Sequence, residues 1–377
     1  MTGIKVAQLS VLIIFAANAL LVAGLIALKT VHRSRARRHH RRKTGYMALI
    51  SRHVTYANCT DPITSRMATD PAFLDALIDI RNAVVGPEVE TLSGIVDRHG
   101  VITLQEARLR AQFPLGRRLK AAVALAELGD ESAAATLIDH LADREPEVRI
   151  QAARGLGRMK WTPAIDAIVA RFPVETPWVR TRFADTLLGF GAAATWPLIA
   201  YIRVNHHFER EGPVAAIRTL AALGDDQAAQ PLIEVLRNAT DVEVRIATIE
   251  ALGLLGSLRA APALRNQARS ADWRVRAKAM SAIGDIGDAR SVDLIASGLN
   301  DTNWWVRRNA AAALTRVKGG VDRLCTALVG DDQYAAHAAA EALTDAGEVG
   351  AARQRLDDGR PLERDRVLVE RLIGVGA

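Results

Sequence analysis

The most constraining feature of this sequence is an internal repeat of about 31 residues. The dipeptide Val-Arg recurs five times, and an apolar residue follows eight positions after each Val. The five copies are Val148-Arg149, Val179-Arg180, Val244-Arg245, Val275-Arg276 and Val306-Arg307. Three degenerate copies begin at Arg117, Gly212 and Ala335, so the eight starts are spaced by 31, 31, 33, 32, 31, 31 and 29 residues. A fixed period of this length indicates stacked helical hairpins.

Each repeat contains the signals of two short helices. An amphipathic stretch and a polar turn precede the Val-Arg segment, and in several copies a Gly follows twelve positions after the Val. Glycine suits a helix end because it enters the left-handed conformation without a Cβ penalty. Since one such hairpin cannot bury its apolar face alone, a stack of about eight must share a continuous core. We therefore predict an all-α solenoid over residues 117–359, closed by a capping helix in residues 360–377.

The pattern Val-Arg-x-x-Ala-x-x-x-Leu-Gly, the preceding Asp turn and the period resemble bacterial HEAT repeats of the phycobilisome-lyase-like subclass. The resemblance covers about residues 115–350 and implies a right-handed α-α superhelix. It also implies a ladder between neighbouring units, formed by a turn Asp and the Arg six residues later. Asp143 with Arg149 and Asp301 with Arg307 match that spacing. We interpret the repeat arginines as structural: Arg149, Arg180, Arg245, Arg276 and Arg307.

A row of cations is the first candidate for recognition. In arrays of this kind the Val-Arg helix lines the concave side, and positions two, three and six after the Val are expected to face outward. Six of the eight units carry a cation there, with Asp185 and Glu250 as acidic exceptions. We call these cations the basic stripe: Lys120, Arg154, Arg182, Arg218, Lys278 and Arg308. The stripe predicts binding of an acidic or extended protein segment. The alternative is a solvated face whose charges arise by chance.

Four Trp residues lie one or two positions before the Val of a repeat: Trp178, Trp273, Trp304 and Trp305. Trp is enriched in interface hot spots, which makes Trp304 and Trp305 candidates for partner contact. The competing interpretation, which we favour for the group, is that indoles in this turn cover the joint between units.

The N-terminus is predicted to be a membrane anchor. Residues 6–28 contain no charged residue, and as a helix they reach roughly 35 Å, enough to cross a hydrocarbon core of about 30 Å. Eight basic residues follow in residues 29–43, against Lys5 alone before the segment. The positive-inside bias then gives a single-pass protein of the inner membrane, with its N-terminus outside and the array in the cytoplasm. A cleaved signal peptide is the alternative, because residues 17–19 fit a small-x-small cleavage site.

The net charge of +7 originates at this junction. The first 43 residues hold nine Lys and Arg and no Asp or Glu, which leaves −2 for residues 44–377. A nucleic-acid-binding array needs cations over its binding face, so we expect no nucleic acid partner. The basic segment of residues 29–43 is expected to hold the topology and to bind anionic lipid head groups. Its lipid-facing members are Arg33, Arg35, Arg37, Arg38, Arg41, Arg42 and Lys43.

Residues 44–116 do not follow the period and are predicted to form an N-terminal helical cap. Apolar spacing indicates helices over residues 73–85, 88–96 and 103–113, the first of them opened by Asp70 or Pro71. The charged segment of residues 365–373 is predicted to form the helix that closes the other end of the array.

No enzyme motif is present in the sequence. It contains no Gly-x-x-x-x-Gly-Lys phosphate loop, no Gly-x-Ser-x-Gly elbow and no His-Glu dipeptide. Cys59 and Cys325 have no His at motif spacing and are expected to pack as small apolar residues. The pair His206-His207 invites a metal hypothesis, but adjacent histidines rarely chelate one ion, so we expect an irregular loop there. We predict no catalytic residue, metal or cofactor.

Together these observations predict a non-catalytic, membrane-tethered scaffold or adaptor that binds a protein partner. Bacterial anchored proteins that look like this one are associated with envelope assembly, which suggests a membrane glycosyltransferase or another envelope-assembly protein as the partner. The alternative function is that of a tetrapyrrole (bilin) lyase on a HEAT scaffold, because the subclass that the repeat resembles includes such enzymes.

Overall fold

The computed structural model describes residues 2–56, 62–111 and 113–372, with side chains described from residue 20 onward. Within these ranges every regular element is helical, from α1 to α21, with nine short 3-10 helices between them and no strand. The chain divides into two compact units, Met1–Met159 and Lys160–Ala377, which are described in turn. Cys59 lies outside the described residues.

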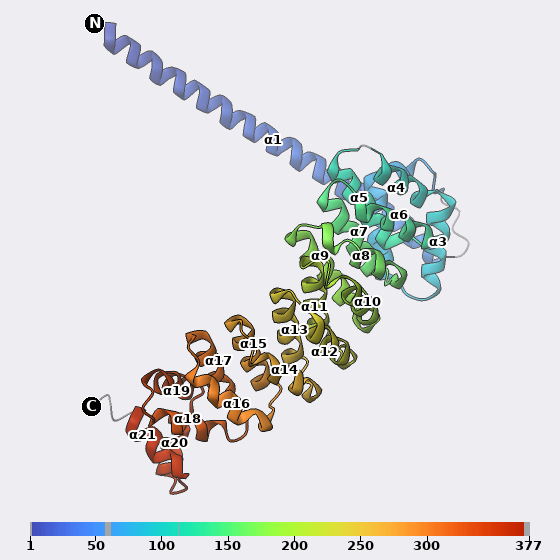
Figure 1. Cartoon of the computed structure of the whole chain (residues 1–377). Helices are drawn as coiled ribbons and strands as arrows, with labels where there is room; N and C mark the ends of the chain where they lie inside the picture. Colours follow the sequence, from blue (N-terminus) through green and yellow to red (C-terminus); the bar gives the residue numbers. More distant parts are fainter. Residues whose placement is uncertain (1, 57–61, 112, 373–377) are drawn as a thin grey trace. The chain divides into compact units, whose positions relative to one another are not determined.

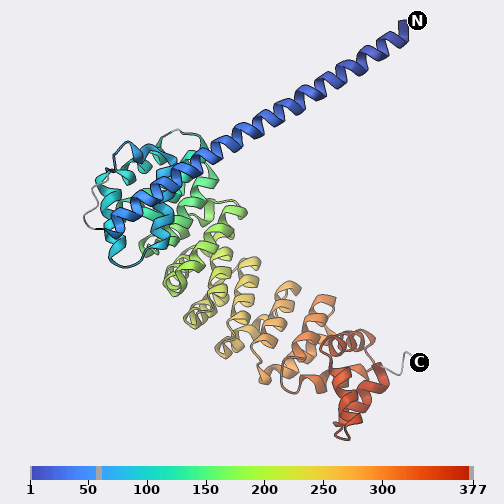
Figure 2. The same ribbon diagram turned by 180° about the vertical axis from the view of Figure 1, so that it is seen from behind.

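Helix α1 (Thr2–Thr55) is one continuous helix that contains the predicted anchor, the basic segment and the start of the cap. Its C-terminal part packs on α2 (Pro71–Ala83) and α3 (Pro87–Arg98), while its N-terminal part leaves the bundle as a single rod (Figure 1, Figure 2). The apolar side chains described at the start of this rod are more than half exposed: Leu20, Leu21, Val22, Leu25, Ile26 and Leu28.

The cap region forms the helices that its apolar spacing predicts, with small shifts at the ends. They are α2, α3 and α4 (Val101–Arg110), and the Asp70 side chain caps α2 by accepting a hydrogen bond from the backbone N–H of Ala72 (3.0 Å). Phe73 and Leu77 are fully buried with Ile50 of α1 in one core. This shared core fixes the C-terminal end of α1 to the cap.

The first unit ends with the first copies of the repeat, α5 (Leu115–Leu128), α6 (Glu131–Asp139) and α7 (Pro146–Arg158). The closing Gly expected at position 129 departs from the pattern, because Gly129 has φ −86° rather than a left-handed conformation. The side chain of Asp130 takes over at this turn and caps α6 through the N–H groups of Ser132 and Ala133.

The second unit stacks helical hairpins in sequence order (green to red in Figure 1 and Figure 2). In each hairpin the second helix carries the Val-Arg signature or its degenerate form, and we call these the Val–Arg helices. The hairpins are α8 (Ile165–Val169) with α9 (Pro177–Phe190), α10 (Thr195–Asn205) with α11 (Glu211–Leu223), α12 (Ala229–Asn238) with α13 (Val242–Leu254), α14 (Ala261–Gln267) with α15 (Trp273–Asp285), α16 (Val292–Ser297) with α17 (Trp304–Leu314), and α18 (Gly320–Leu328) with α19 (Gln333–Asp345). Helices α20 (Glu348–Asp357) and α21 (Glu363–Leu372) close the unit, as predicted.

The repeat positions supply the core of these hairpins. The Val of each intact copy and the Leu or Ile eight positions later are fully buried, as are the small residues Ala279 and Ala310 at which neighbouring helices meet. Five of the predicted closing glycines have positive φ values of 62–72°: Gly191, Gly224, Gly256, Gly287 and Gly347. The two-helix interpretation of the repeat is therefore confirmed, with Gly129 as the exception among the expected closing glycines.

Residues 177–205 have the length and apolar composition of a membrane-spanning helix. They form α9, a short 3-10 turn that begins at Gly191, and α10, so the chain reverses within the segment. Phe183 and Leu198 are fully buried in the array. The apolar character of this stretch is that of a core hairpin in a helical array.

Candidate partner-binding surface

The repeat arginines form a ladder between consecutive repeats. Its geometry differs from the one that the sequence predicted. The carboxylate of Asp301 accepts hydrogen bonds from Nε (2.8 Å) and Nη2 (2.9 Å) of Arg276 in the preceding repeat. The backbone carbonyl of Asp301 accepts one from Arg307 Nη1 (2.8 Å). Arg307, six residues after Asp301, therefore binds the main chain of the turn. The ion pair between the two repeats is formed by Arg276 of the preceding repeat.

The same arrangement occurs at Asp143, where Arg118 binds the carboxylate and Arg149 Nη1 donates to the backbone carbonyl (2.8 Å). Burial is the largest single influence and raises the pKa of the Asp143 and Asp301 carboxyl groups. The hydrogen bonds from Arg118 and Arg276, the backbone N–H groups of Glu145 and Asn303 and the neighbouring positive charges together outweigh it and hold each pKa below its usual range. Arg118 was not among the expected arginines, because Arg117 replaces the Val that marks the five intact copies. Arg118 follows the repeat start Arg117 just as Arg follows Val in the intact copies, and this position could have identified it.

Where the position equivalent to Asp143 and Asp301 is not Asp, the arginines of the preceding repeat use other partners. The contacts are Arg245 with Ser270 Oγ (3.2 Å), Arg180 with Glu211 Oε2 (2.9 Å), and the Arg307 guanidinium with the Tyr334 ring (5.1 Å to its centre). Each of these links lies between consecutive repeats. A side chain so engaged holds the stack together and is not available to a partner.

The basic stripe is solvent-facing, since five of its cations are exposed and Arg182 is half-buried. Three of the six are paired with carboxylates: Arg182 with Asp185 (3.4 Å), Lys278 with Glu250, and Arg308 with Glu341 (3.5 Å). The two acidic exceptions noted in the sequence are therefore the partners of stripe cations. Among the described residues of the second unit, Arg218 is the stripe cation that has no hydrogen bond or ion pair.

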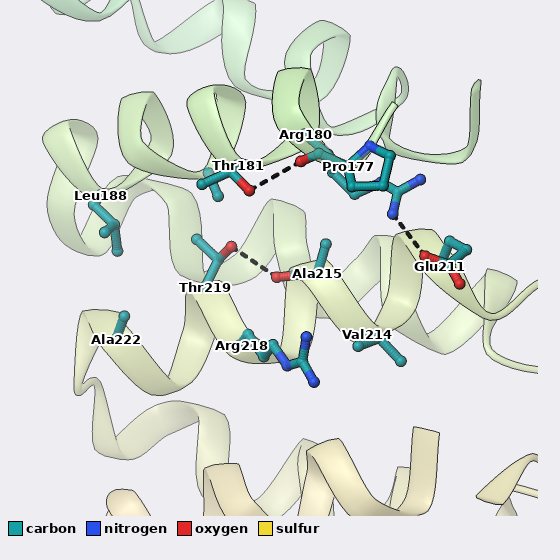
Figure 3. Close-up of a pocket in the computed structure, with 11 residues that line it drawn as sticks. Pro177, Arg180, Thr181, Leu188, Glu211, Val214, Ala215, Arg218, Thr219 and Ala222 are labelled. Carbon is teal, nitrogen blue, oxygen red and sulfur yellow. Dashed lines mark hydrogen bonds and ion pairs between the residues drawn. The ribbon is translucent and has the colours of Figure 1, made fainter. Parts of the chain in front are cut away.

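Arg218 lines a groove of about 320 Å³ between α9 and α11 (Figure 3). The wall from α9 includes Thr181, Ala184 and Leu188, and the wall from α11 includes Ala215 with Arg218. These groups are mostly apolar or small. The groove therefore combines an apolar trough with one cation that has no partner in the described chain.

The other polar groups of this groove are already engaged. The hydroxyl of Thr181 donates to the carbonyl of Pro177 (2.9 Å) and that of Thr219 to the carbonyl of Ala215 (2.8 Å), as the dashed lines in Figure 3 show. Arg180 donates to Glu211 and to the backbone carbonyls of Phe172 and Glu175, which precede α9 in the sequence. A ligand in the groove thus meets Arg218 as its available charge.

Repeat irregularity explains why a groove lies at this joint. At the position nine after the Val, α13 and α15 carry Gly253 and Gly284, where an added Cβ would lie only 3.0 Å and 2.7 Å from the next Val–Arg helix. Helix α9 carries Leu188 at this position, 38% exposed. The repeat that begins at Val179 is also two residues longer than the preceding repeat and one longer than the next, and in the next repeat Pro213 takes the place of the Arg. We attribute the groove to the larger side chain at the crossing point.

The repeat Trp residues are all substantially exposed. Their exposed fractions are 51% for Trp178, 39% for Trp273, 44% for Trp304 and 48% for Trp305. Trp304 and Trp305 contact each other edge to face (4.7 Å between ring centres), and the Arg308 guanidinium lies over Trp304 (5.4 Å). Trp178 was not expected to be the most exposed of the four. These rings cover only part of their joints.

Part of the basic segment of α1 binds the cap. His39 Nε2 lies 2.8 Å from Asp75, Arg42 lies 3.3 Å from Asp70, and Lys43 pairs with Asp79. These three contacts lie along one side of α1 and hold it on α2. The six remaining Lys and Arg of the segment are exposed, with no ion pair in the described part of the chain: Lys29, Arg33, Arg35, Arg37, Arg38 and Arg41.

The residues considered for chemistry have structural surroundings. Cys325 is buried, and burial raises the pKa of its thiol to about 11. The His206 ring is buried, with Nδ1 2.9 Å from the Ile202 carbonyl, and it contacts the ring of His207. No group of three His, Cys, Asp or Glu side chains within the described ranges could hold a metal ion.

Three segments of the chain match the HEAT repeat family: residues 104–187, 198–273 and 261–344, together more than half of its length. The chain belongs to the HEAT-repeat family. No curated protein matches the sequence.

Solved structures similar to this HEAT-repeat protein include the CpcE–CpcF complex of phycocyanin lyase from Nostoc sp. (20% identity, 71% of this chain and 92% of that chain, TM-score 0.32). Human deoxyhypusine hydroxylase is another (18%, 70% and 99%, TM-score 0.30). A third is Kap95p in a complex with RanGDP (12%, 89% and 62%, TM-score 0.46). None of these similarities bears on the activity of this chain.

Proposed function

We propose that this HEAT-repeat protein is a non-catalytic, membrane-tethered scaffold that holds an extended segment of a protein partner in the groove between α9 and α11. Solenoid arrays present extended binding surfaces of this kind. The observation that carries the proposal is Arg218, an exposed cation that lies beside an apolar groove and has no hydrogen bond or ion pair with any described residue. A segment with an acidic residue next to an apolar one would satisfy both parts of the groove.

The tether rests on α1. Its residues 6–28 lack charge, and the side chains described from Leu20 to Leu28 expose their apolar surface around the helix. Apolar surface is unfavourable in water by about 25 cal/mol per Å², so a helix of this kind favours a hydrocarbon environment. The arrangement that follows is a single pass through the inner membrane of a bacterial cell, with the N-terminus outside and the array in the cytoplasm.

The exposed cations of the basic segment support contact with anionic lipid head groups. The six that do not bind the cap include Arg33, Arg37 and Arg41, which are four residues apart and so share one side of α1. A membrane protein is then the natural partner, because tethering raises the effective concentration of the array for other proteins in the same membrane. Within that class we favour an envelope-assembly protein such as a glycosyltransferase.

The test is site-specific photo-crosslinking in intact cells that produce the full chain. A photoreactive phenylalanine analogue replaces Ala184 in the groove, and the crosslinked partner peptide is sequenced by mass spectrometry. We expect one membrane protein whose crosslinked peptide contains an Asp or Glu next to an apolar residue. R218E should lower the crosslink yield about tenfold, because it replaces attraction with repulsion.

The matched control is R353E, at an exposed arginine in the middle of α20 that has no hydrogen bond or ion pair among the described residues. It should leave the yield unchanged. Equal yields from R218E and R353E would contradict the groove as the binding site. A bilin lyase is the alternative function, and an absorbance titration of the purified chain with a linear tetrapyrrole tests it directly.

A further inference from the structure

A second cavity lies in the first unit. It measures about 320 Å³ and is lined by residues from the start of α2, the end of α4 and the start of α5. Its polar lining includes Gln105, Arg108, Arg117 and Lys120. Lys120 was expected in the basic stripe, and the structure places it beside Arg117 of the same degenerate repeat and Arg108, which lies outside the period.

The charges of this cavity are unbalanced. Arg108, Arg117 and Lys120 face one carboxylate, Asp75, which is already bound by His39 (2.8 Å). Arg108 donates to the Thr69 carbonyl (3.2 Å) and to a Gln105 oxygen (3.4 Å), both uncharged. Burial, and then the charge of Arg117, lower the pKa of Arg108. The cluster therefore lacks a counter-charge within the described chain.

A buried donor in the same cavity also lacks a partner. Gln105 is only 1% exposed, and its side-chain oxygen accepts from Arg108. Its amide nitrogen Nε2 is buried without a hydrogen-bond acceptor. Buried N–H groups are nearly always paired, so an unpaired one that lines a cavity points to a ligand that supplies the acceptor.

We propose that this cavity binds a phosphate group. Phosphate carries about −1.5 to −2 charges and three acceptor oxygens at neutral pH, which matches three cations set against one carboxylate. Guanidinium groups suit phosphate because their fork donates two parallel hydrogen bonds. Gln105 Nε2 adds a neutral donor from the buried side. Leu74 and Phe113 form an apolar part of the lining, which fits the organic portion of a phosphate ester.

Two sources can supply such a group. One is a soluble phosphate ester, and the other is the head group of an anionic lipid, because Asp75 at the cavity is bound to His39 in the basic segment of α1. The site itself does not depend on the scaffold function, and it uses none of the residues of the groove between α9 and α11.

The test is isothermal titration calorimetry of the full chain purified in dodecyl maltoside. The first arm titrates glycerol 3-phosphate, with glycerol as the uncharged control. The second arm repeats the titration in micelles that contain phosphatidylglycerol or phosphatidylcholine. Binding of glycerol 3-phosphate that persists in both lipids supports a soluble ligand. Binding that phosphatidylglycerol alone suppresses supports a lipid head group.

Two variants show whether the cavity is responsible. The double variant R117Q/K120Q should weaken binding at least tenfold, whereas K318Q, at an exposed lysine without a described partner in the second unit, should not. Q105M should also weaken binding at least tenfold, yet its ligand-free thermal midpoint should stay the same or rise, because it removes an unpaired buried donor. A purely structural Gln105 would instead lower the midpoint. Absence of binding in every arm, or equal binding by Q105M, R117Q/K120Q and K318Q, overturns the proposal.

Discussion

At the scale of single residues, the ion pair between Arg276 and Asp301 is a sensitive point of the array. The pair is largely buried, with 19% and 15% of the two side chains exposed, and it has two short hydrogen bonds. D301N removes the charge but keeps the shape. We expect it to lower the free energy of unfolding by about 2 kcal/mol, the usual loss for a hydrogen-bonded charge of this kind. Urea denaturation at pH 7 measures this change.

The control is D293N, which breaks the exposed pair between Asp293 and Arg323. Exposed ion pairs contribute about 0–1 kcal/mol, so this change should stay below about 0.5 kcal/mol. If D301N and D293N are equally stable, the ladder does not stabilise the array in the way that its geometry implies.

The same pair predicts a pH dependence. The folded-state pKa of Asp301 lies below its ordinary value. Burial raises it, but the hydrogen bonds from Arg276, the backbone N–H of Asn303 and the charges of Arg276 and Arg307 together lower it by more. A lowered pKa contributes stability above the unfolded value of about 3.9, and that stability is lost as the pH falls through the folded value. The difference in the free energy of unfolding between the wild type and D301N should therefore be largest at pH 7 and should decrease below about pH 4. A gap that is constant from pH 7 to pH 3 would contradict this assignment.

At the scale of the helices, two glycines test how closely the Val–Arg helices approach. A Cβ added at Gly284 of α15 would lie 2.7 Å from the Cα of Ala313 in α17, so G284A must push the two helices apart. We expect a loss of about 1–3 kcal/mol, the usual range for overpacking. Thermal unfolding followed by circular dichroism measures it.

Gly94 in α3 is the matched control, since a Cβ there meets nothing within 4 Å. Alanine is a better helix former than glycine by about 1 kcal/mol, so G94A should be neutral or stabilising. Opposite signs for G284A and G94A would show that close helix approach, rather than helix propensity, selects glycine in the repeat. If both substitutions change the stability in the same direction, close helix approach does not explain the glycine at position 284.

The helices were predictable from sequence to the extent that their signals are local. The buried Val and Leu positions, the closing glycines and the Asp70 cap all follow from spacing and turn chemistry. The groove was not predicted, because it depends on how α11 packs against Leu188 of α9, and these contacts are not local in sequence. Its signal was present, since Leu188 stands where three other copies have Gly and the rest have Ala or Thr. The phosphate cavity gave no such signal, because Gln105 and Arg108 lie outside the period.

At the scale of the whole chain, the tether and the array should be separable. The contacts that hold α1 on the cap begin at His39, and the core contribution of α1 comes from residues such as Ile50. Deletion of residues 2–31 therefore removes the apolar rod without touching these contacts. We expect the deleted chain to leave the membrane fraction while its thermal midpoint stays within about 2 °C of the full chain, because no described core residue is lost.

Carbonate extraction of membranes from cells that produce each chain measures this separation. The full chain should stay in the membrane pellet after carbonate extraction. The chain that lacks residues 2–31 should already be in the soluble fraction before carbonate is added. A variant with Arg33, Arg37 and Arg41 replaced by Gln keeps the apolar rod and isolates the lipid contact of the exposed cations. It should remain in the pellet, since burial of the apolar segment outweighs head-group attraction of about 1 kcal/mol per cation. A full chain that carbonate releases would contradict the transmembrane tether, and it would leave the groove to recruit a partner from solution.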